Sequence, residues 1–179
     1  MENLRIQRRH DAASIAARLA EMATTLDKEY EGQSLVLVGV LKGSSFFLAD
    51  LARRLTNPVG CEFISVRRAE GSDEIVQIDF ATGFTVRDRP VLLLKDVVSF
   101  GVIDNYLVDH LRDDGAASVR LGAIVDKPHD RRAEIAVDHS LFQAEGGILV
   151  GYGMDYQGRF AQLPYIAEVF TEPGALPGQ

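Results

Sequence analysis

Apolar residues gather into short continuous runs along this chain, each bounded by polar or glycine-containing turns. An unbroken run of four to eight apolar residues predicts a strand buried on both faces, as the strands of a parallel sheet are. Such runs lie at residues 34–40, 61–66, 91–94 and 118–125. A looser alternation at 74–80 predicts another strand, and residues 149–156 form a strand end punctuated by glycines.

Between the runs, apolar residues follow the spacing of helices. Asp11 can cap a helix whose stripe consists of Ile15, Leu19, Met22 and Leu26. Ile103, Leu107 and Leu111 mark one face of another helix, which Gly115 ends. Strands that alternate with helices predict an α/β fold with a mainly parallel sheet.

The central run ends in Lys95 and Asp96, and a short loop to Gly101 is expected to join it to the next helix. Ligands of open α/β sheets bind at this edge, where N–H groups at a helix start can hold an anion. We therefore expect this loop to form part of any ligand-binding site of the protein. Its content is unusual, because apolar residues stand where a phosphate cradle normally has Gly, Ser and Thr: Val97, Val98, Phe100, Val102 and Ile103.

Another strand-to-helix turn contains Lys42 and Gly43. Glycine allows a backbone geometry closed to other residues, and Ser44 or Ser45 can cap the helix that follows. Two interpretations stay open for this turn. It is either an anion site, with the lysine beside exposed N–H groups, or an ordinary turn with a solvated lysine.

Composition predicts one domain spanning residues 1–179. The chain has 46% hydrophobic and 25% charged residues, and its apolar runs are too short to span a membrane. The first residues lack the apolar segment of a signal peptide, so a cytoplasmic protein is expected. A net charge of −7 argues against a broad nucleic-acid surface.

The single cysteine, Cys61, excludes an internal disulfide and fits a reducing compartment. Because it opens an apolar run, a buried core thiol is favoured over a nucleophile. The four histidines show no metal-ligand spacing.

Four motifs, taken in order, resemble the hypoxanthine-guanine phosphoribosyltransferase family. They lie at residues 37–44, 63–66, 125–128 and 150–156. The resemblance implies a type I phosphoribosyltransferase fold, a mainly parallel twisted sheet flanked by helices with a small hood of terminal segments over its carboxyl edge. Family members join hypoxanthine or guanine to phosphoribosyl pyrophosphate with Mg²⁺.

By this resemblance, Lys42 and Gly43 match the loop whose N–H groups hold pyrophosphate. Lys127 matches the lysine that donates to the exocyclic oxygen of the purine, so that a base without this acceptor would leave a charge unpaired. Ile148 replaces the usual aromatic stacker, and Leu149 matches the residue whose backbone touches the base. Asp155 matches a Mg²⁺ ligand, and a hard carboxylate suits that ion.

The central loop departs from the family pattern of two acids, two apolar residues, Asp-Thr-Gly and a further Thr. Ser99 stands at the position of the aspartate credited with proton transfer, and a serine without a nearby base cannot take up that proton. Phe100 and Ile103 replace hydroxyls that bind the 5′-phosphate, and Lys95 replaces an acid that helps to hold the ribose. Outside the loop, the departures are Arg68 with Ala69, where a Ser-Tyr pair is usual, and Ala161, where an arginine is usual.

These departures favour a family member with impaired catalysis, a pseudoenzyme that binds a purine base or nucleotide in a regulatory role. It would act as a homo-oligomer or as the partner of an active relative, without a cofactor, a nucleic acid or a membrane. Two alternatives stay open: an active hypoxanthine-guanine phosphoribosyltransferase with an altered donor site and Mg²⁺, or a transferase with another donor. The predicted substrate-binding residues are Lys42, Gly43, Lys95, Asp96, Ser99, Phe100, Gly101, Lys127, Ile148 and Leu149, with Asp155 for the metal.

The sequence also predicts how the residues of the site are arranged. Lys42, Asp96, Lys127 and Asp155 are expected around one cleft. Phe100 is expected to fold inward and plug the phosphate pocket, since burying it contributes about 1.5–3 kcal/mol. The alternative is an exposed apolar patch of Phe100, Val98 and Val102. Lys95 is expected to compensate the charges of Asp96 and Asp155.

Overall fold

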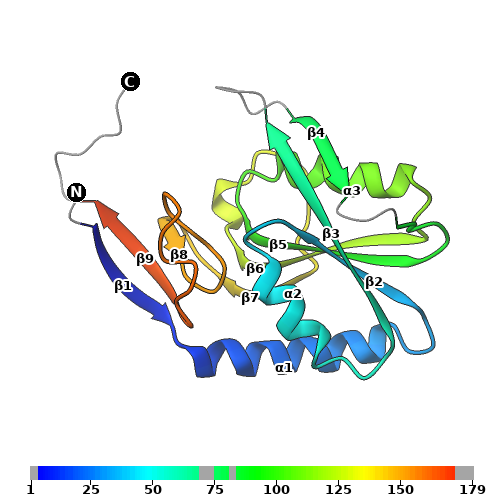
Figure 1. Ribbon diagram of the computed structural model, residues 1–179, viewed down its shortest axis with the longest axis horizontal. Coiled ribbons are helices and arrows are strands. Elements are labelled where there is room, and N and C mark those ends of the chain that lie inside the picture. The colour runs from blue at the N-terminus through cyan, green and yellow to red at the C-terminus, as the bar shows by residue number, and fades with distance from the viewer. Residues whose placement is uncertain (1–3, 69–74, 81–83, 172–179) are drawn as a thin grey trace.

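The computed structural model describes residues 4–68, 75–80 and 84–171, and its ribbon is shown in Figure 1. The helices are α1 (Ala12–Glu29), α2 (Ser45–Ala52) and α3 (Val102–Asp113), with a 3₁₀ turn η1 (Pro128–Asp130). The strands are β1 (Leu4–His10), β2 (Leu35–Val40), β3 (Val59–Arg68), β4 (Ile75–Phe80), β5 (Pro90–Val98), β6 (Ser118–Asp126), β7 (His139–Gln143), β8 (Ile148–Val150) and β9 (Ile166–Thr171).

The large sheet has the order β4-β3-β2-β5-β6-β7. All its neighbouring pairs are parallel except β3 with β4, which lies antiparallel at the edge. The predicted parallel neighbours are confirmed, since Val36 pairs with Val91 and Leu93 with Leu121. The carboxyl ends of β2, β5 and β6 therefore meet at one edge.

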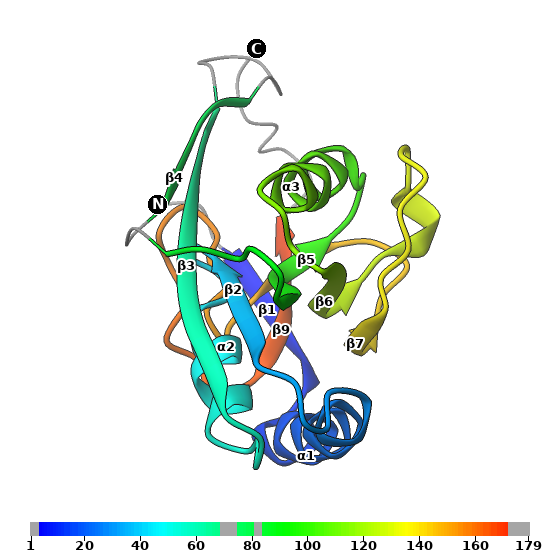
Figure 2. The same ribbon diagram turned by 90° about the vertical axis from the view of Figure 1, so that its right-hand side faces the viewer.

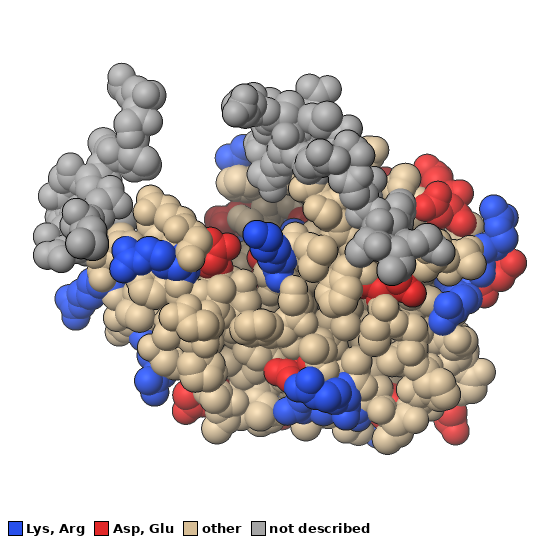
Figure 3. Space-filling model, viewed as in Figure 1, with Lys and Arg blue, Asp and Glu red and all other residues tan. Residues whose placement is uncertain are grey.

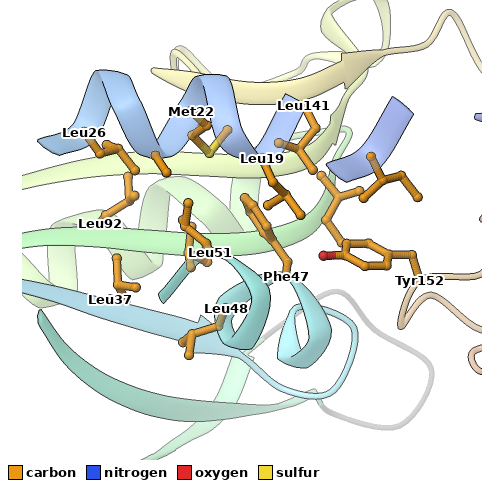
Figure 4. Close-up of a cluster of buried hydrophobic side chains, with 14 of the residues drawn as sticks. Leu19, Met22, Leu26, Leu37, Phe47, Leu48, Leu51, Leu92, Leu141 and Tyr152 are labelled. Carbon is orange, nitrogen blue, oxygen red and sulfur yellow. The ribbon is translucent and has the colours of Figure 1, made fainter. Parts of the chain in front are cut away.

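Alternating side chains of the large sheet form two cores. Leu35, Leu37 and Leu92 face α1 and α2, and Figure 4 shows α1 leucines packed with Phe47 and Leu51 in this cluster. On the opposite face, which α3 covers in Figure 2, Val36, Val38 and Leu93 pack with Leu107 and Leu111 of α3. The predicted stripe of α1 is buried, and the Asp11 carboxylate caps it by accepting from Ser14 N at 2.8 Å.

A second sheet, with the order β1-β9-β8, forms the hood implied by the resemblance. It stands to the left of the large sheet in Figure 1. Tyr152, just after β8, ties it to α2, because its hydroxyl donates to Asp50 Oδ2 at 2.7 Å. Burial, followed by this bond, raises the pKa of Tyr152 far above its usual value.

Three local predictions were wrong. Cys61 is exposed, because β4 pairs with β3 only from Ile64 onward and leaves the earlier part of β3 at the edge. Neither serine side chain makes a capping bond to α2, although Ser44 holds the N-cap position, since Ser44 Oγ donates backward to Val40 O at 2.7 Å. The central strand continues through Val98, so that Val97 and Val98 belong to β5 rather than to the loop. Ala69, one of the family departures, lies outside the described residues.

On the face shown in Figure 3, Lys and Arg are interspersed with Asp and Glu on a mostly uncharged surface. Among the described residues, no helix is long and apolar enough to cross a bilayer.

Candidate functional site

The turn after β2 is wedged between β5 and the loop that follows β8. A Cβ on Gly43 would lie 2.0 Å from Asp96 Oδ2, so only glycine fits against that carboxylate. A Cβ on Gly153 would lie 2.4 Å from the backbone oxygen of Gly43, and Gly153 has a φ of +97°. The predicted residues Gly43 and Asp96 are therefore in contact, and the loop after β8 contacts the backbone of the same turn.

Replacing Gly153 with alanine should dislodge the hood from this turn. We expect the free energy of unfolding to fall by more than about 3 kcal/mol, because a backbone clash adds to the strain of about 1–3 kcal/mol at a positive φ. Gly158→Ala is the matched control, with a φ of +71° and open space around its Cβ. Urea unfolding of both variants measures the difference, and equal losses would show that the Gly153–Gly43 approach is unimportant.

Lys127 joins the ends of β5 and β6 to the segment before β8. It is only 8% exposed, its ammonium donates to Gly147 O, and its backbone N donates to Val98 O at 2.9 Å. Ile148, at 42% exposed, and the half-buried Leu149 follow Gly147 directly. The three predicted purine-contacting residues thus lie in one region of the carboxyl edge.

Ser99 has a carboxylate partner that the sequence analysis missed. Its hydroxyl donates to Asp130 Oδ2 at 2.9 Å, from the turn η1. Arg131 fixes the same backbone, since its guanidinium donates to Ser99 O at 2.8 Å and pairs with Asp126. The expectation that no base lies near Ser99 was wrong, because a contact across 31 residues leaves no local pattern in the sequence.

Phe100 does not plug the site. It is 46% exposed, and the guanidinium of Arg132 lies 4.1 Å from its ring centroid. The backbone N–H groups of Arg132 and Ala133 both donate to Phe100 O. These contacts from the segment after η1 hold the loop and cover the ring with a cation, which is attractive to an aromatic face. The prediction of an inward ring was therefore wrong. Val102 is exposed beside it, whereas Val98 is fully buried.

Lys95 pairs with two carboxylates. Its ammonium lies 3.7 Å from Asp96 Oδ1, as expected, and 3.8 Å from Asp104 Oδ1 in the first turn of α3. Asp104 is 5% exposed, and its Oδ1 accepts no hydrogen bond from any described residue. Burial raises the pKa of Asp104, and the Lys95 ammonium opposes that shift. Asp104 was not predicted from the sequence, although it shares the buried face of Leu107, Val108 and Leu111.

A cavity of about 260 Å³ opens where β5 leads into α3. Gly101, the N-cap of α3, has a φ of +79° that a side chain would strain. Residues that line the cavity include Lys95, Ser99, Phe100, Val102, Asp104 and Arg132. The predicted loop residues therefore share one cavity with Asp104.

The structure offers no preformed magnesium site among the residues it describes, since no three metal-ligating side chains come together. Asp155 is exposed, and its Oδ2 accepts from Gly158 N at 2.7 Å. Mg²⁺ is usually held by one or two carboxylates together with substrate phosphates. A single carboxylate with one oxygen already bonded does not fit the ion by itself. We predicted that Lys42, Asp96, Lys127 and Asp155 surround one cleft. Lys42 and Asp155 are both exposed, and the clustering of all four residues stays a prediction.

Comparisons with known proteins agree with this arrangement. Residues 8–157 match the family model of the phosphoribosyl transferase domain. The hypoxanthine-guanine phosphoribosyltransferase of Streptococcus pneumoniae is 32% identical over 166 residues, which cover 91% of each chain. The chain belongs to the hypoxanthine-guanine phosphoribosyltransferase family. The predicted type I phosphoribosyltransferase fold is thereby confirmed.

Solved structures of this family superpose on the whole fold. A hypoxanthine-guanine phosphoribosyltransferase from Bacillus anthracis has a TM-score of 0.85 and 27% identity, over 94% of this chain and 100% of that one. A Trypanosoma cruzi hypoxanthine phosphoribosyl transferase, solved to study how its C-terminal region affects oligomeric state and activity, has a TM-score of 0.85. It is 27% identical, over 92% of this chain and 91% of that one.

Proposed function

We propose that this chain binds a 6-oxopurine base or a derivative of it, transfers phosphoribosyl groups poorly, and acts in binding or regulation. The observation that carries the proposal is the ammonium of Lys95 between Asp96 and Asp104, at 3.7 and 3.8 Å. It places a cation where the family pattern has an acid that helps to hold the ribose. The part of the site predicted to bind the purine has the lysine of the family pattern, Lys127. The part predicted to bind the phosphoribosyl donor departs from that pattern.

The buried Lys127 supports purine binding. Its ammonium is anchored on Gly147 O with little solvent around it, so a ligand oxygen nearby would gain a charge-assisted hydrogen bond. A base without that oxygen would displace water from the Lys127 ammonium and would not replace the hydrogen bond of that water. Such a base should therefore bind more weakly. Lys127 would therefore select a 6-oxopurine.

The donor side supports poor transfer. Phe100 and Ile103 present no hydroxyl at the start of α3, and Ala161 has no cation for pyrophosphate. The exposed turn at Lys42 would be left to hold the leaving group. Asp155 alone would have to bind Mg²⁺, with the donor supplying the other oxygens.

A second function is favoured by one contact, that of Ser99 with Asp130. The carboxylate of Asp130 could accept the purine proton through the Ser99 hydroxyl, which would give an active hypoxanthine-guanine phosphoribosyltransferase with an altered donor site. Turnover that is lost in Asp130→Asn, with hypoxanthine binding intact, would favour this function over the first.

Calorimetry with hypoxanthine tests the proposal directly. We expect binding by the wild-type chain and about 10- to 150-fold weaker binding by Lys127→Met, from the loss of a hydrogen bond to a charged group worth about 1.5–3 kcal/mol. Lys28→Met, at an exposed lysine on α1, is the control and should bind as the wild type does. Equal affinity of Lys127→Met and wild type, or no binding by the wild type, would contradict the proposal.

We further propose a single domain over residues 1–179, a cytoplasmic location, and assembly with another copy or with an active relative. The family match over residues 8–157 supports the single domain, since it includes the large sheet together with β8 and the end of β1 from the hood.

A further inference from the structure

The cavity at the start of α3 contains a buried acceptor without a donor. Asp104 lines it, the side chain is 8% exposed, and Oδ1 accepts no hydrogen bond within the described part of the chain. Buried polar atoms of native proteins nearly always have a partner, so an orphaned one that lines a cavity points to a missing ligand group. The missing group must therefore be a hydrogen-bond donor.

A phosphate cannot do this. An ionised phosphate presents only acceptor oxygens, and so does an ionised carboxylate, so neither can donate to the other. Their charges also repel, and more strongly because the Asp104 carboxylate is buried. A hydroxyl group, in contrast, can donate to Asp104 Oδ1 and accept from a neighbour in turn.

The cations around the cavity do not reverse this preference. Lys95 is already shared by Asp96 and Asp104, at 3.7 and 3.8 Å. Arg132 favours an anion, but it is exposed and lies over the ring of Phe100. The helix start of α3 also favours an anion, yet the carboxylate of Asp104 already supplies negative charge in the first turn.

The other lining groups suit an uncharged ligand. Phe100, Val102 and Ile103 give the cavity apolar walls, and the Ser99 hydroxyl is committed to Asp130. The backbone N of Lys127 donates to Val98 O, and the next residue, Ser99, lines the cavity, so the predicted purine region lies close to the cavity wall. A ligand held at Lys127 by its base would therefore extend toward Asp104.

We propose that the cavity takes the free hydroxyl end of a sugar, so that this chain binds a 6-oxopurine nucleoside in preference to its 5′-phosphate. The inference rests on the proposed function, because Lys127 must hold the base. Asp104 is then the residue that determines the selectivity of that site between a nucleoside and its 5′-phosphate.

The test is calorimetry of the full chain at neutral pH with hypoxanthine, inosine and inosine 5′-phosphate. We expect inosine to bind at least tenfold tighter than its phosphate, and tighter than hypoxanthine. Asp104→Asn keeps the shape of the side chain, removes the charge and adds a donor, so the tenfold preference should fall toward one. Asp109→Asn, at an exposed position of the same helix, should keep the preference of the wild type.

The outcomes separate the two proposals. If hypoxanthine binds but the phosphate binds as tightly as inosine, the inference is overturned and the proposed function stands. If none of the three ligands binds, the proposed function is overturned together with the inference. A preference that persists unchanged in Asp104→Asn would overturn the role of Asp104.

Discussion

Purified protein should form nucleotide from hypoxanthine at least ~10³-fold more slowly than a relative with the acidic family loop, at saturating donor and Mg²⁺. General acid–base catalysis contributes about 10²–10⁴-fold to such reactions. Loss of one preorganised electrostatic contact costs about 10²–10³-fold. By the resemblance, both kinds of position are affected, with Ser99 at the place of the acid and with Phe100 and Ile103 at the places of the phosphate contacts.

The Ser99–Asp130 contact could offset only the first loss, because it provides a proton acceptor but no phosphate ligand. The double variant Ser99→Asp/Phe100→Thr should therefore gain less than about tenfold, since effects of residues that act together are not additive. Lys95 and Ala161 would still depart from the family pattern.

Chromatographic detection of inosine 5′-phosphate measures the rates of nucleotide formation by this protein and by the acidic-loop relative under identical conditions. The control is an Asp130→Asn variant, which separates residual turnover that depends on the Ser99 contact from background. A rate within tenfold of the acidic-loop relative would contradict the prediction and establish the active alternative.

The fold was predictable where strands are buried on both faces. β2 and the first half of β5 are fully buried, and their apolar runs are unbroken in the sequence. The hood was not predicted from the residues themselves. β1 alternates between half-buried and exposed positions and contains several arginines. A short, half-exposed strand resembles a loop until its partner is known.

The sequence predicted where candidate site residues lie along the strands and turns. It did not predict which side chains far apart in the sequence contact one another. Gly43 and Lys127 lie at the strand ends where the motifs placed them. Phe100 was predicted wrongly because the gain from burial was considered without the competing Arg132 contact. Asp104 could have been found, since it occupies the position three residues before Leu107 on the apolar face of α3.

Replacing Lys95 with methionine should lower the free energy of unfolding at neutral pH by about 3–5 kcal/mol, the usual loss when one partner of a buried ion pair is removed. The variant leaves Asp104 buried without the cation at 3.8 Å, and also removes the cation near Asp96. Lys28→Met, at an exposed lysine, is the matched control and should change stability by less than about 0.5 kcal/mol.

The loss should depend on pH in a defined direction. Burial already raises the pKa of Asp104, and Lys95 lowers it, so the variant should raise it further. The folded variant then binds a proton more tightly than the unfolded chain, whose Asp pKa is about 3.9. Its stability deficit should be largest above the folded pKa of Asp104 and should shrink as the pH falls toward the unfolded value.

Urea unfolding of wild type and variant at pH 7 and pH 5 measures this change. The double variant Lys95→Met/Asp104→Leu should recover most of the loss, because replacing both members of a buried ion pair with apolar residues is often neutral or stabilising by about 1–4 kcal/mol. A deficit that is the same at both pH values, or a double variant no more stable than Lys95→Met, would show that the charge of Asp104 is not what Lys95 compensates.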